Sequence, residues 1–428
     1  MSLRGSIRVP SDKSISHRAL LFASIARGTS RLSDLLPSDD VLSTLAAVRQ
    51  LGARADLQEG KHGLSGTVTG FAGRPACGAV DIDCGNSGTT TRLLMGLLAG
   101  LGVEARLFGD ASLSTRPMGR VMDPLSEMGA SLSAQEGHLP VHLDARRGPL
   151  RAVDYATRQA SAQVKSAILL AGLFARGTTR VTEPAASRDH TERLLPAFGV
   201  PVHVDGLSAA VEGPALPHAH DMSVPADPSS AAFVAVAAAL TAGSEVTIEQ
   251  VSLNPTRTGA LQVLQDMGCV LVYDGEHEEG AEPVGDVVVR TCPRLSGVDV
   301  SAERIPALID EIPVLALAAA AASGETVFRG AGELRVKESD RFAAIIEGLA
   351  ELGVEAWADG DDLHIAGRGT TALDVPERIA FATHHDHRLA MTWHLAGLVF
   401  GFSAVLDDAA CVSVSWPGFY GDIESLRK

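Results

Sequence analysis

One pattern recurs six times along the 428-residue chain: a short polar turn is followed directly by a long, nearly uncharged apolar segment. The turns stand at Lys13, Asn86, Ser161, Ser229, Asp310 and His387. Subtraction of these numbers gives separations of 73, 75, 68, 81 and 77 residues. Self-similarity at a nearly fixed spacing is typical of an internally repeated architecture. The chain is therefore expected to fold from six copies of one unit.

Each copy predicts the same order of elements, β-α-β-α-β-β. A strand-like run precedes each turn, at residues 6–9, 80–84, 151–155, 222–224, 298–300 and 379–383. The apolar segments predict helices that stop at Gly28, Gly100 or Gly102, Gly177, Gly243, Gly324 and Gly401, because glycine is favoured just past a helix end. Amphipathic second helices follow in turn, and five of them are expected to end alike, at Leu51-Gly52, Met128-Gly129, Phe198-Gly199, Met267-Gly268 and Leu352-Gly353. The sixth copy runs out at the C-terminus.

Helices without a polar face are predicted to lie inside, covered by the amphipathic helices and the sheets. Six units are too many for one core in a chain of this length, so we expect two lobes of three units each. The predicted break lies near residues 221–227, a proline-containing stretch between the third and fourth copies. No low-complexity linker marks this break, which favours lobes that hinge.

Composition narrows the range of partners. The formal charge of −16 disfavours nonspecific binding to nucleic acid or to an anionic membrane. Aromatic residues make up only 4%, which argues against a stacking platform for single-stranded nucleic acid. The longest apolar runs, such as residues 231–240, are about half of the ~20 residues that span a bilayer. We therefore expect no nucleic-acid or membrane partner, and a local basic pocket for any anionic ligand.

The five cysteines, at positions 77, 84, 269, 292 and 411, include no C-x-x-C pair. An odd and scattered set indicates reduced thiols. The first residues also lack the apolar core of a signal peptide. We therefore expect a cytoplasmic protein.

Cations gather where the predicted helices start. Lys13 and Arg18 flank the first turn, although a helix start already carries partial positive charge. Basic turns also occur at residues 114–120, 335–341 and 387–388. Such placement suits phosphate or carboxylate ligands, and Asp310 and Glu338 remain for proton transfer. The pattern favours a reaction between two polyanionic small molecules, while the fourth turn has no cation and is interpreted as structural.

These residues also have simpler explanations. A single Ser, Asn or Asp at such a turn is more often a helix cap, by roughly 3 to 1, and a lone Arg or Lys is usually solvated. The histidines at 384–387 lack metal-ligand spacing, so we assign an electrostatic or hydrogen-bonding role to His387 and surface positions to the others. No nucleotide-binding glycine motif or nucleophile elbow is present.

Six ordered stretches carry a family resemblance. They are Asp12-Lys-Ser-Ile-Ser-His-Arg18, Gly85-Asn-Ser-Gly-Thr89, Arg116-Pro-Met-Gly-Arg120, Ser161-Ala-Gln163, Arg335-Val-Lys-Glu-Ser-Asp-Arg341 and Asp386-His-Arg388. The set resembles the motifs of 5-enolpyruvylshikimate-3-phosphate synthases, the enolpyruvyl transferases of the shikimate pathway. Each stretch is short, but the ordered set spans almost the whole chain and is highly specific.

The resemblance implies an α/β protein with a two-lobed, inside-out α/β barrel of six βαβαββ repeats, three per lobe. One lobe would comprise residues 13–224 and the other residues 1–12 plus 225–428, so that the N-terminal strand joins the second half. The lobes would close on shikimate 3-phosphate and phosphoenolpyruvate, transfer the enolpyruvyl group to the 5-hydroxyl and release phosphate, towards chorismate and the aromatic amino acids. No metal or organic cofactor is implied, and we expect a monomer.

The resemblance also implies roles for residues. Shikimate 3-phosphate would be held by Lys13, Ser14, Arg18, Ser161, Gln163, Arg188, Asp310 and Lys337. Phosphoenolpyruvate would be held by Lys13, Gly88, Arg116, Gln163, Arg341 and Arg388. Asp310 would take the proton of the 5-hydroxyl as it attacks C2, and Glu338, with Lys13, would protonate the methylene carbon. The tetrahedral adduct would then expel phosphate, with His387 assisting electrostatically.

Several positions indicate the glyphosate-tolerant branch of the family. Arg188 and the wording Lys337-Glu-Ser-Asp-Arg341 match it, and Glu333 and Val414 stand where many other members have Asn and Lys. Gly88, however, occupies a position at which that branch has Ala. We therefore expect glyphosate to inhibit the enzyme, because the methyl group that would crowd the inhibitor is absent.

Three alternatives remain. The related transferase that acts on UDP-N-acetylglucosamine carries a reactive Cys five residues before an Arg-Pro pair, where this chain has Ala111. RNA 3′-phosphate cyclase uses a related repeat with ATP, but the charge of −16 and the few aromatic residues disfavour it. A repeat protein that binds polyanions without catalysis is the third.

Overall fold

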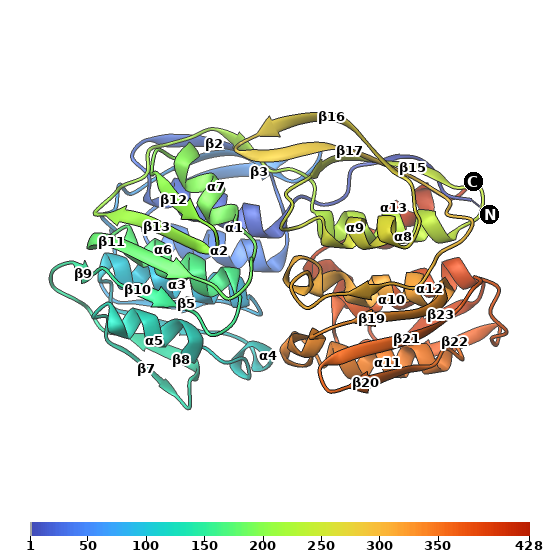
Figure 1. Cartoon of the computed structure of the whole chain (residues 1–428). Helices are drawn as coiled ribbons and strands as arrows, with labels where there is room; N and C mark the ends of the chain where they lie inside the picture. The colour runs from blue at the N-terminus through green and yellow to red at the C-terminus, as the bar shows by residue number, and fades with distance from the viewer. Residues whose placement is uncertain (1) are drawn as a thin grey trace. The chain divides into compact units, whose positions relative to one another are not determined.

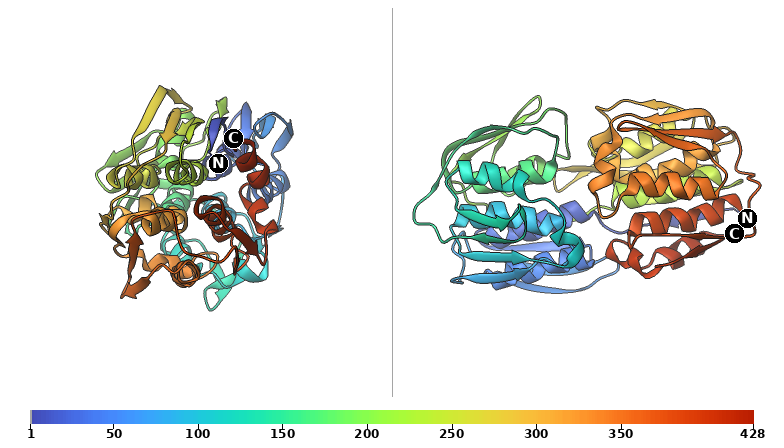
Figure 2. Two further views of the ribbon diagram at one scale, coloured as in Figure 1. Left: turned by 90° about the vertical axis from the view of Figure 1, so that its right-hand side faces the viewer. Right: turned by 90° about the horizontal axis from the view of Figure 1, so that it is seen from below.

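A computed structural model describes residues 2–428, and these form two units (Figure 1). The N-terminal unit consists of Ser11–Val224 and Glu278–Glu282. The C-terminal unit consists of the residues up to Pro10, Pro225–His277 and Pro283–Lys428. Both chain ends lie side by side in the C-terminal unit, where the Arg4 N–H donates to the Leu426 carbonyl oxygen at 2.8 Å (Figure 2).

The N-terminal unit contains the first three repeats. Its helices are α1 (Lys13–Ile25), α2 (Asp39–Gln50), α3 (Gly88–Leu101), α4 (Ala111–Ser114), α5 (Gly119–Glu127), α6 (Ala162–Gly172) and α7 (His190–Ala197). Its strands are β2 (Thr29–Leu35), β3 (Arg54–Glu59), β4 (Leu64–Thr69), β5 (Val80–Asp83), β6 (Ala105–Phe108), β7 (Leu132–Gln135), β8 (His138–Leu143), β9 (Leu150–Arg151), β10 (Asp154–Ala156), β11 (Ala175–Thr182), β12 (Val202–Asp205), β13 (Ser208–Gly213) and β14 (Met222–Ser223).

The C-terminal unit contains the other three repeats. Its α-helices are α8 (Pro228–Leu240), α9 (Gly259–Asp266), α10 (Ile312–Ala321), α11 (Arg341–Glu351), α12 (His387–Phe400) and α13 (Phe419–Ser425). Its short 3₁₀ helices are η1 (Ile305–Ala307), η2 (Ile309–Glu311), η3 (Ala331–Val336) and η4 (Ala410–Val414). Its strands are β1 (Arg4–Ile7), β15 (Glu245–Ser252), β16 (Leu271–Glu279), β17 (Glu282–Arg290), β18 (Asp299–Val300), β19 (Ser323–Phe328), β20 (Ala356–Asp359), β21 (Asp362–Arg368), β22 (Arg378–Phe381) and β23 (Ser403–Leu406), except that the adjoining ends of β16 and β17 are among the residues Glu278–Glu282 of the N-terminal unit.

The sheets follow one plan, in which the strand before a polar turn pairs in parallel with the strand after the inner helix. In the second repeat the order is β5-β6-β8-β7, and the fifth repeat has the equivalent order β18-β19-β21-β20. The first and fourth repeats exchange their first strands: β1 pairs with β15, and β14 pairs with β2. The sixth repeat keeps only the parallel pair β22-β23, as the sequence predicts. The strand expected at residues 151–155 is divided into β9 and β10.

The prediction for the ends of the amphipathic helices is confirmed in all five cases. Leu51, Met128, Phe198, Met267 and Leu352 are the C-cap residues of α2, α5, α7, α9 and α11. Each following glycine has a positive φ, from 65° at Gly353 to 110° at Gly52. Other residues rarely adopt this left-handed conformation, which is why glycine stops these helices cleanly.

The prediction for the ends of the inner helices is correct only in part. Gly102 and Gly401 are left-handed C-caps of α3 and α12. Helices α1, α8 and α10 instead end at C-cap residues in extended conformation, and Gly28, Gly243 and Gly324 follow two residues later. Gly177 lies within β11, since α6 already ends at Gly172. In these repeats the glycine shapes the turn into, or the start of, the next strand.

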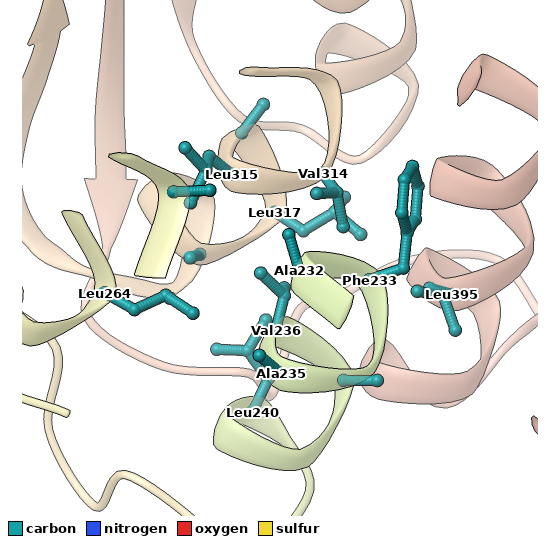
Figure 3. Close-up of a cluster of buried hydrophobic side chains, with 14 of the residues drawn as sticks. Ala232, Phe233, Ala235, Val236, Leu240, Leu264, Val314, Leu315, Leu317 and Leu395 are labelled. Carbon is teal, nitrogen blue, oxygen red and sulfur yellow. The ribbon is translucent and has the colours of Figure 1, made fainter. Parts of the chain in front are cut away.

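The apolar helices form the interior of each unit, as predicted. Every residue of α8 and of α10 is buried. Helices α8, α10 and α12 pack on one another, and Figure 3 shows Phe233 of α8 beside Leu395 of α12 and Val236 facing α10. In the N-terminal unit, a Cβ atom added to Gly96 of α3 would lie 2.1 Å from the Ala167 carbonyl oxygen of α6. Small residues therefore let these inner helices approach closely. Among residues 2–428, no helix is both long enough and apolar enough to cross a membrane.

Candidate active site

Five of the six polar turns place a Ser or Asp at a helix cap, so the simpler explanation holds for those residues but not for Asp310 of the fifth turn. Asp12 accepts from the Ile15 N–H at 2.8 Å at the start of α1, and Ser87 accepts from the Thr90 N–H at 3.1 Å at the start of α3. Ser161, Asp227 and Asp386 cap α6, α8 and α12 in the same way. These caps fix the helix starts from which the predicted site residues project.

The two cations of the first turn have different surroundings. Lys13 is part-buried, and its Nζ lies 2.9 Å from Oδ2 of Asp40 at the start of α2. Arg18 is only 2% exposed, and it donates to the Ser14 carbonyl oxygen, the Ser166 hydroxyl and the Thr191 hydroxyl at 2.7–2.9 Å. Burial lowers the pKa of Arg18 to about 10, so the group is still charged at neutral pH. We expected these two cations to be balanced by an anionic ligand, but protein groups already surround them: Asp40 at Lys13, and hydroxyl and carbonyl oxygens at Arg18.

A second cluster of the N-terminal unit gathers around Arg92. Its guanidinium donates to Oε1 of Gln163 at 2.7 Å and to the Pro117 carbonyl oxygen at 3.1 Å. A Cβ atom at Gly88 would lie 2.8 Å from Nη1 of Arg92 and 3.4 Å from Nη1 of Arg116. The structure thus brings three predicted residues, Gly88, Arg116 and Gln163, to one place beside two guanidinium groups.

Sequence reasoning did not select Arg92, although the residue carried a usable signal. It follows Gly88 by four positions in α3, as Arg18 follows Ser14 in α1, so each guanidinium reaches back over the first helical turn. Comparison of the repeats with one another could have found it. Arg188 is half-buried in the loop before α7, and its charge acts on that of Arg18.

In the C-terminal unit, both predicted carboxylates contact Arg341, at the start of α11. Its guanidinium is 1% exposed and contacts three carboxylates: Asp386 at 2.7 Å, Glu338 at 2.7 Å and Asp310 at 3.2 Å. Burial opposes the charge, but these carboxylates outweigh it and raise the pKa of Arg341. One cation therefore holds both carboxylates that the sequence assigned to proton transfer.

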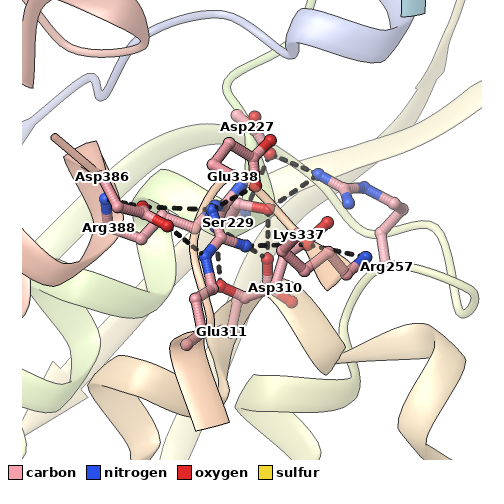
Figure 4. A network of polar contacts seen from close by, with 10 residues as sticks. Asp227, Ser229, Arg257, Asp310, Glu311, Lys337, Glu338, Asp386 and Arg388 are labelled. Atoms are coloured by element: carbon pink, nitrogen blue, oxygen red, sulfur yellow. Dashed lines mark hydrogen bonds and ion pairs between the residues drawn. The ribbon is translucent and has the colours of Figure 1, made fainter. Parts of the chain in front are cut away.

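Lys337 adds a second cation at the same place, because its Nζ lies 3.3 Å from Oδ1 of Asp310 (Figure 4). Asp310 belongs to η2, whereas Lys337 and Glu338 follow η3. These two short 3₁₀ helices place groups that are 27 residues apart in the sequence within contact distance of each other. Asp310 and Glu338 remain partly accessible, with side chains 15% and 29% exposed.

The fourth polar turn, at Asp227 and Ser229, contacts a cation that sequence reasoning did not assign to it, Arg257. Arg257 lies 2.5 Å from Asp227 and donates to the Ser229 hydroxyl at 3.0 Å. Ser229 in turn donates to the Glu311 carboxylate, which also accepts from Nη1 of Arg388 at 3.3 Å (Figure 4). Sequence reasoning missed Arg257 and Glu311, because nothing near them in the sequence marks their contacts.

The histidine cluster divides as expected. His384 and His385 are exposed, and His385 pairs with Asp408 at 2.7 Å. His387 is 3% exposed, is the first residue of α12 and acts electrostatically on Asp386. Within the part of the chain that the structure describes, no group of three or more His, Cys, Asp or Glu residues could hold a metal ion.

Comparison with known proteins shows which family this chain is similar to. The model of the family EPSP synthase (3-phosphoshikimate 1-carboxyvinyltransferase) matches residues 1–423. The 3-phosphoshikimate 1-carboxyvinyltransferase of Akkermansia muciniphila is 47% identical over 430 residues, which cover 99% of this chain and 97% of that protein. The same-named protein of a Methylobacterium species is 48% identical and covers 99% and 95%.

Solved structures of the same family and of a related enolpyruvyl transferase have a similar fold. An EPSP synthase structure from Acinetobacter baumannii has a TM-score of 0.85 at 38% identity, covering 99% of this chain and 96% of that one. The enolpyruvyl transferase NikO from Streptomyces tendae has a TM-score of 0.78 at 19% identity, which shows a shared fold. The expected fold, a two-lobed α/β architecture of six repeats, is confirmed. On these grounds, the chain belongs to the EPSP synthase family.

Proposed function

We propose that this chain carries out the reaction of its family through the residues gathered around Arg341 and Arg92. The reaction transfers the enolpyruvyl group of phosphoenolpyruvate to the 5-hydroxyl of shikimate 3-phosphate and releases phosphate, through a tetrahedral intermediate. The observation that carries the proposal is the contact of Arg341 with both Asp310 and Glu338. An acid and a base are needed together, because the enol carbon becomes a good electrophile only when its methylene carbon is protonated.

In this proposal, Asp310 accepts the proton of the 5-hydroxyl as the oxygen attacks C2 of phosphoenolpyruvate. Glu338, with Lys13, delivers the proton to the methylene carbon. The tetrahedral adduct then expels phosphate, and the buried His387 stabilises the charges that develop. General acid–base groups of this kind contribute about 10²–10⁴-fold each in rate.

The binding residues divide by ligand. Lys13, Ser14, Arg18, Ser161, Gln163, Arg188, Asp310 and Lys337 would hold shikimate 3-phosphate. Lys13, Gly88, Arg116, Gln163, Arg341 and Arg388 would hold phosphoenolpyruvate, and we add Arg92 to this set. The paired guanidiniums beside Gly88 support the assignment, since planar forked donors match carboxylate and phosphate oxygens.

The test is phosphate release from purified protein with phosphoenolpyruvate and either shikimate 3-phosphate or UDP-N-acetylglucosamine. Release with shikimate 3-phosphate alone is the expected result. Release only with the nucleotide sugar would contradict the proposed acceptor. Tight binding of shikimate 3-phosphate without any turnover would favour a polyanion-binding protein.

We further propose that glyphosate inhibits this enzyme, although Arg188, Glu333 and Val414 match or lean towards the tolerant branch. Gly88 supports this proposal, because it has no methyl group that would crowd the Arg92 and Arg116 guanidiniums. Initial rates at fixed phosphoenolpyruvate and rising glyphosate are expected to fall. Rates that do not change would refute the proposal.

We also propose that the protein is cytoplasmic and monomeric. A cytoplasmic location is supported by the five cysteines, all of which are free thiols. A monomer is supported by the small number of large hydrophobic side chains that are exposed within residues 2–428, namely Leu42, Val204, Leu207, Val270, Val272, Val336 and Trp357. Size-exclusion chromatography with light scattering would test the second property.

A further inference from the structure

Lys165 is a buried cation held by two buried carboxylates of the N-terminal unit. The residue lies in α6 and is 5% exposed. Its Nζ is 2.7 Å from Oε2 of Glu183 and 2.7 Å from Oε1 of Glu192. Burial works against the charge, but the two carboxylates outweigh it and raise the pKa of Lys165. Removing charges from water costs several kcal/mol per ion, so such a cluster is weak evidence for stability and suggests another role.

Glu183 also accepts hydrogen bonds from two other segments of the chain. It directly follows β11 and is 3% exposed. Oε1 accepts from the Ser161 N–H at 2.7 Å, and Oε2 accepts from the Ser187 hydroxyl at 2.6 Å. One carboxylate therefore fixes both the cap of α6 and the loop that leads into α7.

A second layer of contacts joins the same two helices, through the neighbouring residue of each. Ser166 follows Lys165, Thr191 precedes Glu192, and their hydroxyl oxygens are 2.7 Å apart. Arg18 donates to both hydroxyls at 2.7 Å. The ion cluster and the Arg18 contacts are thus adjacent layers of one α6–α7 connection.

The segments held in this way carry the residues proposed for shikimate 3-phosphate. Ser161 and Gln163 lie at the start of α6, Arg188 follows Ser187, and Arg18 is bound by the second layer. We propose that Glu183, charged and oriented by Lys165, is a positioning residue for this phosphate-binding group. The inference rests on the proposed function.

The physical reason is the cost of ordering. Ser161 and Arg188 come from separate loops, and a phosphate dianion is bound tightly only if its donors are already in place. Glu183 can order both segments before substrate arrives, because it holds them through the Ser161 N–H, the Ser187 hydroxyl and Lys165. Lys165 lets a carboxylate occupy this place without leaving its charge uncompensated beside an anionic ligand.

The decisive variant is Glu183→Gln, which keeps the size of the side chain but turns one acceptor into a donor. That donor must face either the Ser161 N–H or the Lys165 ammonium and Ser187 hydroxyl. Loss of hydrogen bonds to a charged group predicts a rise of about 10- to 100-fold in KM for shikimate 3-phosphate. The KM for phosphoenolpyruvate is expected to change much less, a split that general destabilisation would not produce.

A milder variant and a matched control complete the test. Ser187→Ala removes one hydrogen bond and no charge, and should shift the same KM in the same direction by a smaller factor if Glu183→Gln fails to fold. Glu212→Gln is the matched control, because Glu212 is exposed on β13 of the same sheet, and it should leave both KM values unchanged.

Folded Glu183→Gln and Ser187→Ala proteins with wild-type KM values for shikimate 3-phosphate would overturn the inference alone. A wild-type protein that neither binds shikimate 3-phosphate nor releases phosphate with it would overturn the proposed function, and this inference with it. The two failures are therefore distinguishable by the wild-type measurement.

Discussion

Arg341 and Asp386 form a buried two-point ion pair, with Nε to Oδ2 at 2.7 Å and Nη2 to Oδ1 at 3.2 Å. The side chains are 1% and 0% exposed. Asp386 also caps α12 by accepting from the Arg388 N–H at 2.9 Å. The pair therefore aligns the guanidinium that holds Asp310 and Glu338 with the helix that carries His387 and Arg388.

Replacing Asp386 by Asn is expected to lower the free energy of unfolding by about 3 kcal/mol, since breaking a buried pair leaves an uncompensated charge. The value lies at the low end of the usual range because Arg341 keeps Glu338 and Asp310. Urea unfolding measures the loss. Glu424→Gln, which breaks an exposed pair with Arg427, is the control and should cost less than about 1 kcal/mol. A similar small loss for Asp386→Asn would contradict the account.

Asp310→Asn removes the proposed base but keeps its shape. We expect kcat to fall about 10²–10⁴-fold. The protein should still bind shikimate 3-phosphate, because Lys337 and the cations of the N-terminal unit remain. Steady-state rates and calorimetric binding separate these effects. Glu347→Gln on α11, whose side chain is 70% exposed, should leave the rate unchanged; an active Asp310→Asn enzyme would assign the base elsewhere.

Gly88→Ala is expected to make the enzyme more tolerant of glyphosate. The added Cβ would lie 2.8 Å from Nη1 of Arg92, which must move, and Arg116 would be crowded at 3.4 Å. One methyl group in a binding site changes affinity by about 10–200-fold, so the inhibition constant should rise at least about tenfold. Gly119→Ala is the matched control, because its Cβ would meet nothing within 4 Å. Equal inhibition of the Gly88→Ala variant and the wild type would exclude the methyl effect.

Gly96→Ala tests the close approach of α3 and α6. Alanine normally stabilises a helix interior by about 1 kcal/mol relative to glycine. Here the methyl group would lie 2.1 Å from the Ala167 carbonyl oxygen, so we expect a net loss of about 1–3 kcal/mol. Thermal unfolding measures it. Gly421→Ala in the exposed part of α13, with open space around the Cβ, should not destabilise the protein.

His17 predicts acid sensitivity above the pH at which carboxylates titrate. It is fully buried and its Nδ1 is 2.7 Å from the Thr44 hydroxyl. Burial lowers the pKa of His17 to about 3, with smaller effects from Asp40, Lys13, Arg18 and Asp12. The unfolded chain binds this proton below a pH of about 6.5 and the folded chain does not. Stability is therefore full above that pH and falls as the pH decreases, by about 1.4 kcal/mol per pH unit.

The comparison of wild type with His17→Gln isolates this proton. The variant should show a shallower decrease in unfolding free energy between pH 6.5 and pH 4, by about one proton's slope. Other titrating groups are common to both proteins and cancel in the difference. Identical slopes would mean that His17 is protonated in the folded state.

Local sequence patterns were enough to predict many elements of the fold. The six polar turns, the buried α8 and α10 and the five apolar–glycine helix ends followed from periodicity and capping rules. The roles of the site residues stay predictions, although Asp310 contacts both Lys337 and Arg341, and Arg341 contacts Glu338. Local rules failed at Gly177 and Gly324, where a glycine serves the next strand instead of the helix end.

By itself, the sequence determined which segments are helices or strands and which side chains could carry charge, because those depend on backbone preferences and on a few neighbouring residues. Only the tertiary structure decided that β1 pairs with β15 and β14 with β2, since strand pairing uses backbone hydrogen bonds that look alike in every short strand. It also decided that Lys165 is buried between Glu183 and Glu192, and that Arg92 faces Gln163. A charged side chain is predicted to be solvated until packing shows which distant carboxylate or amide lies within 3 Å of it.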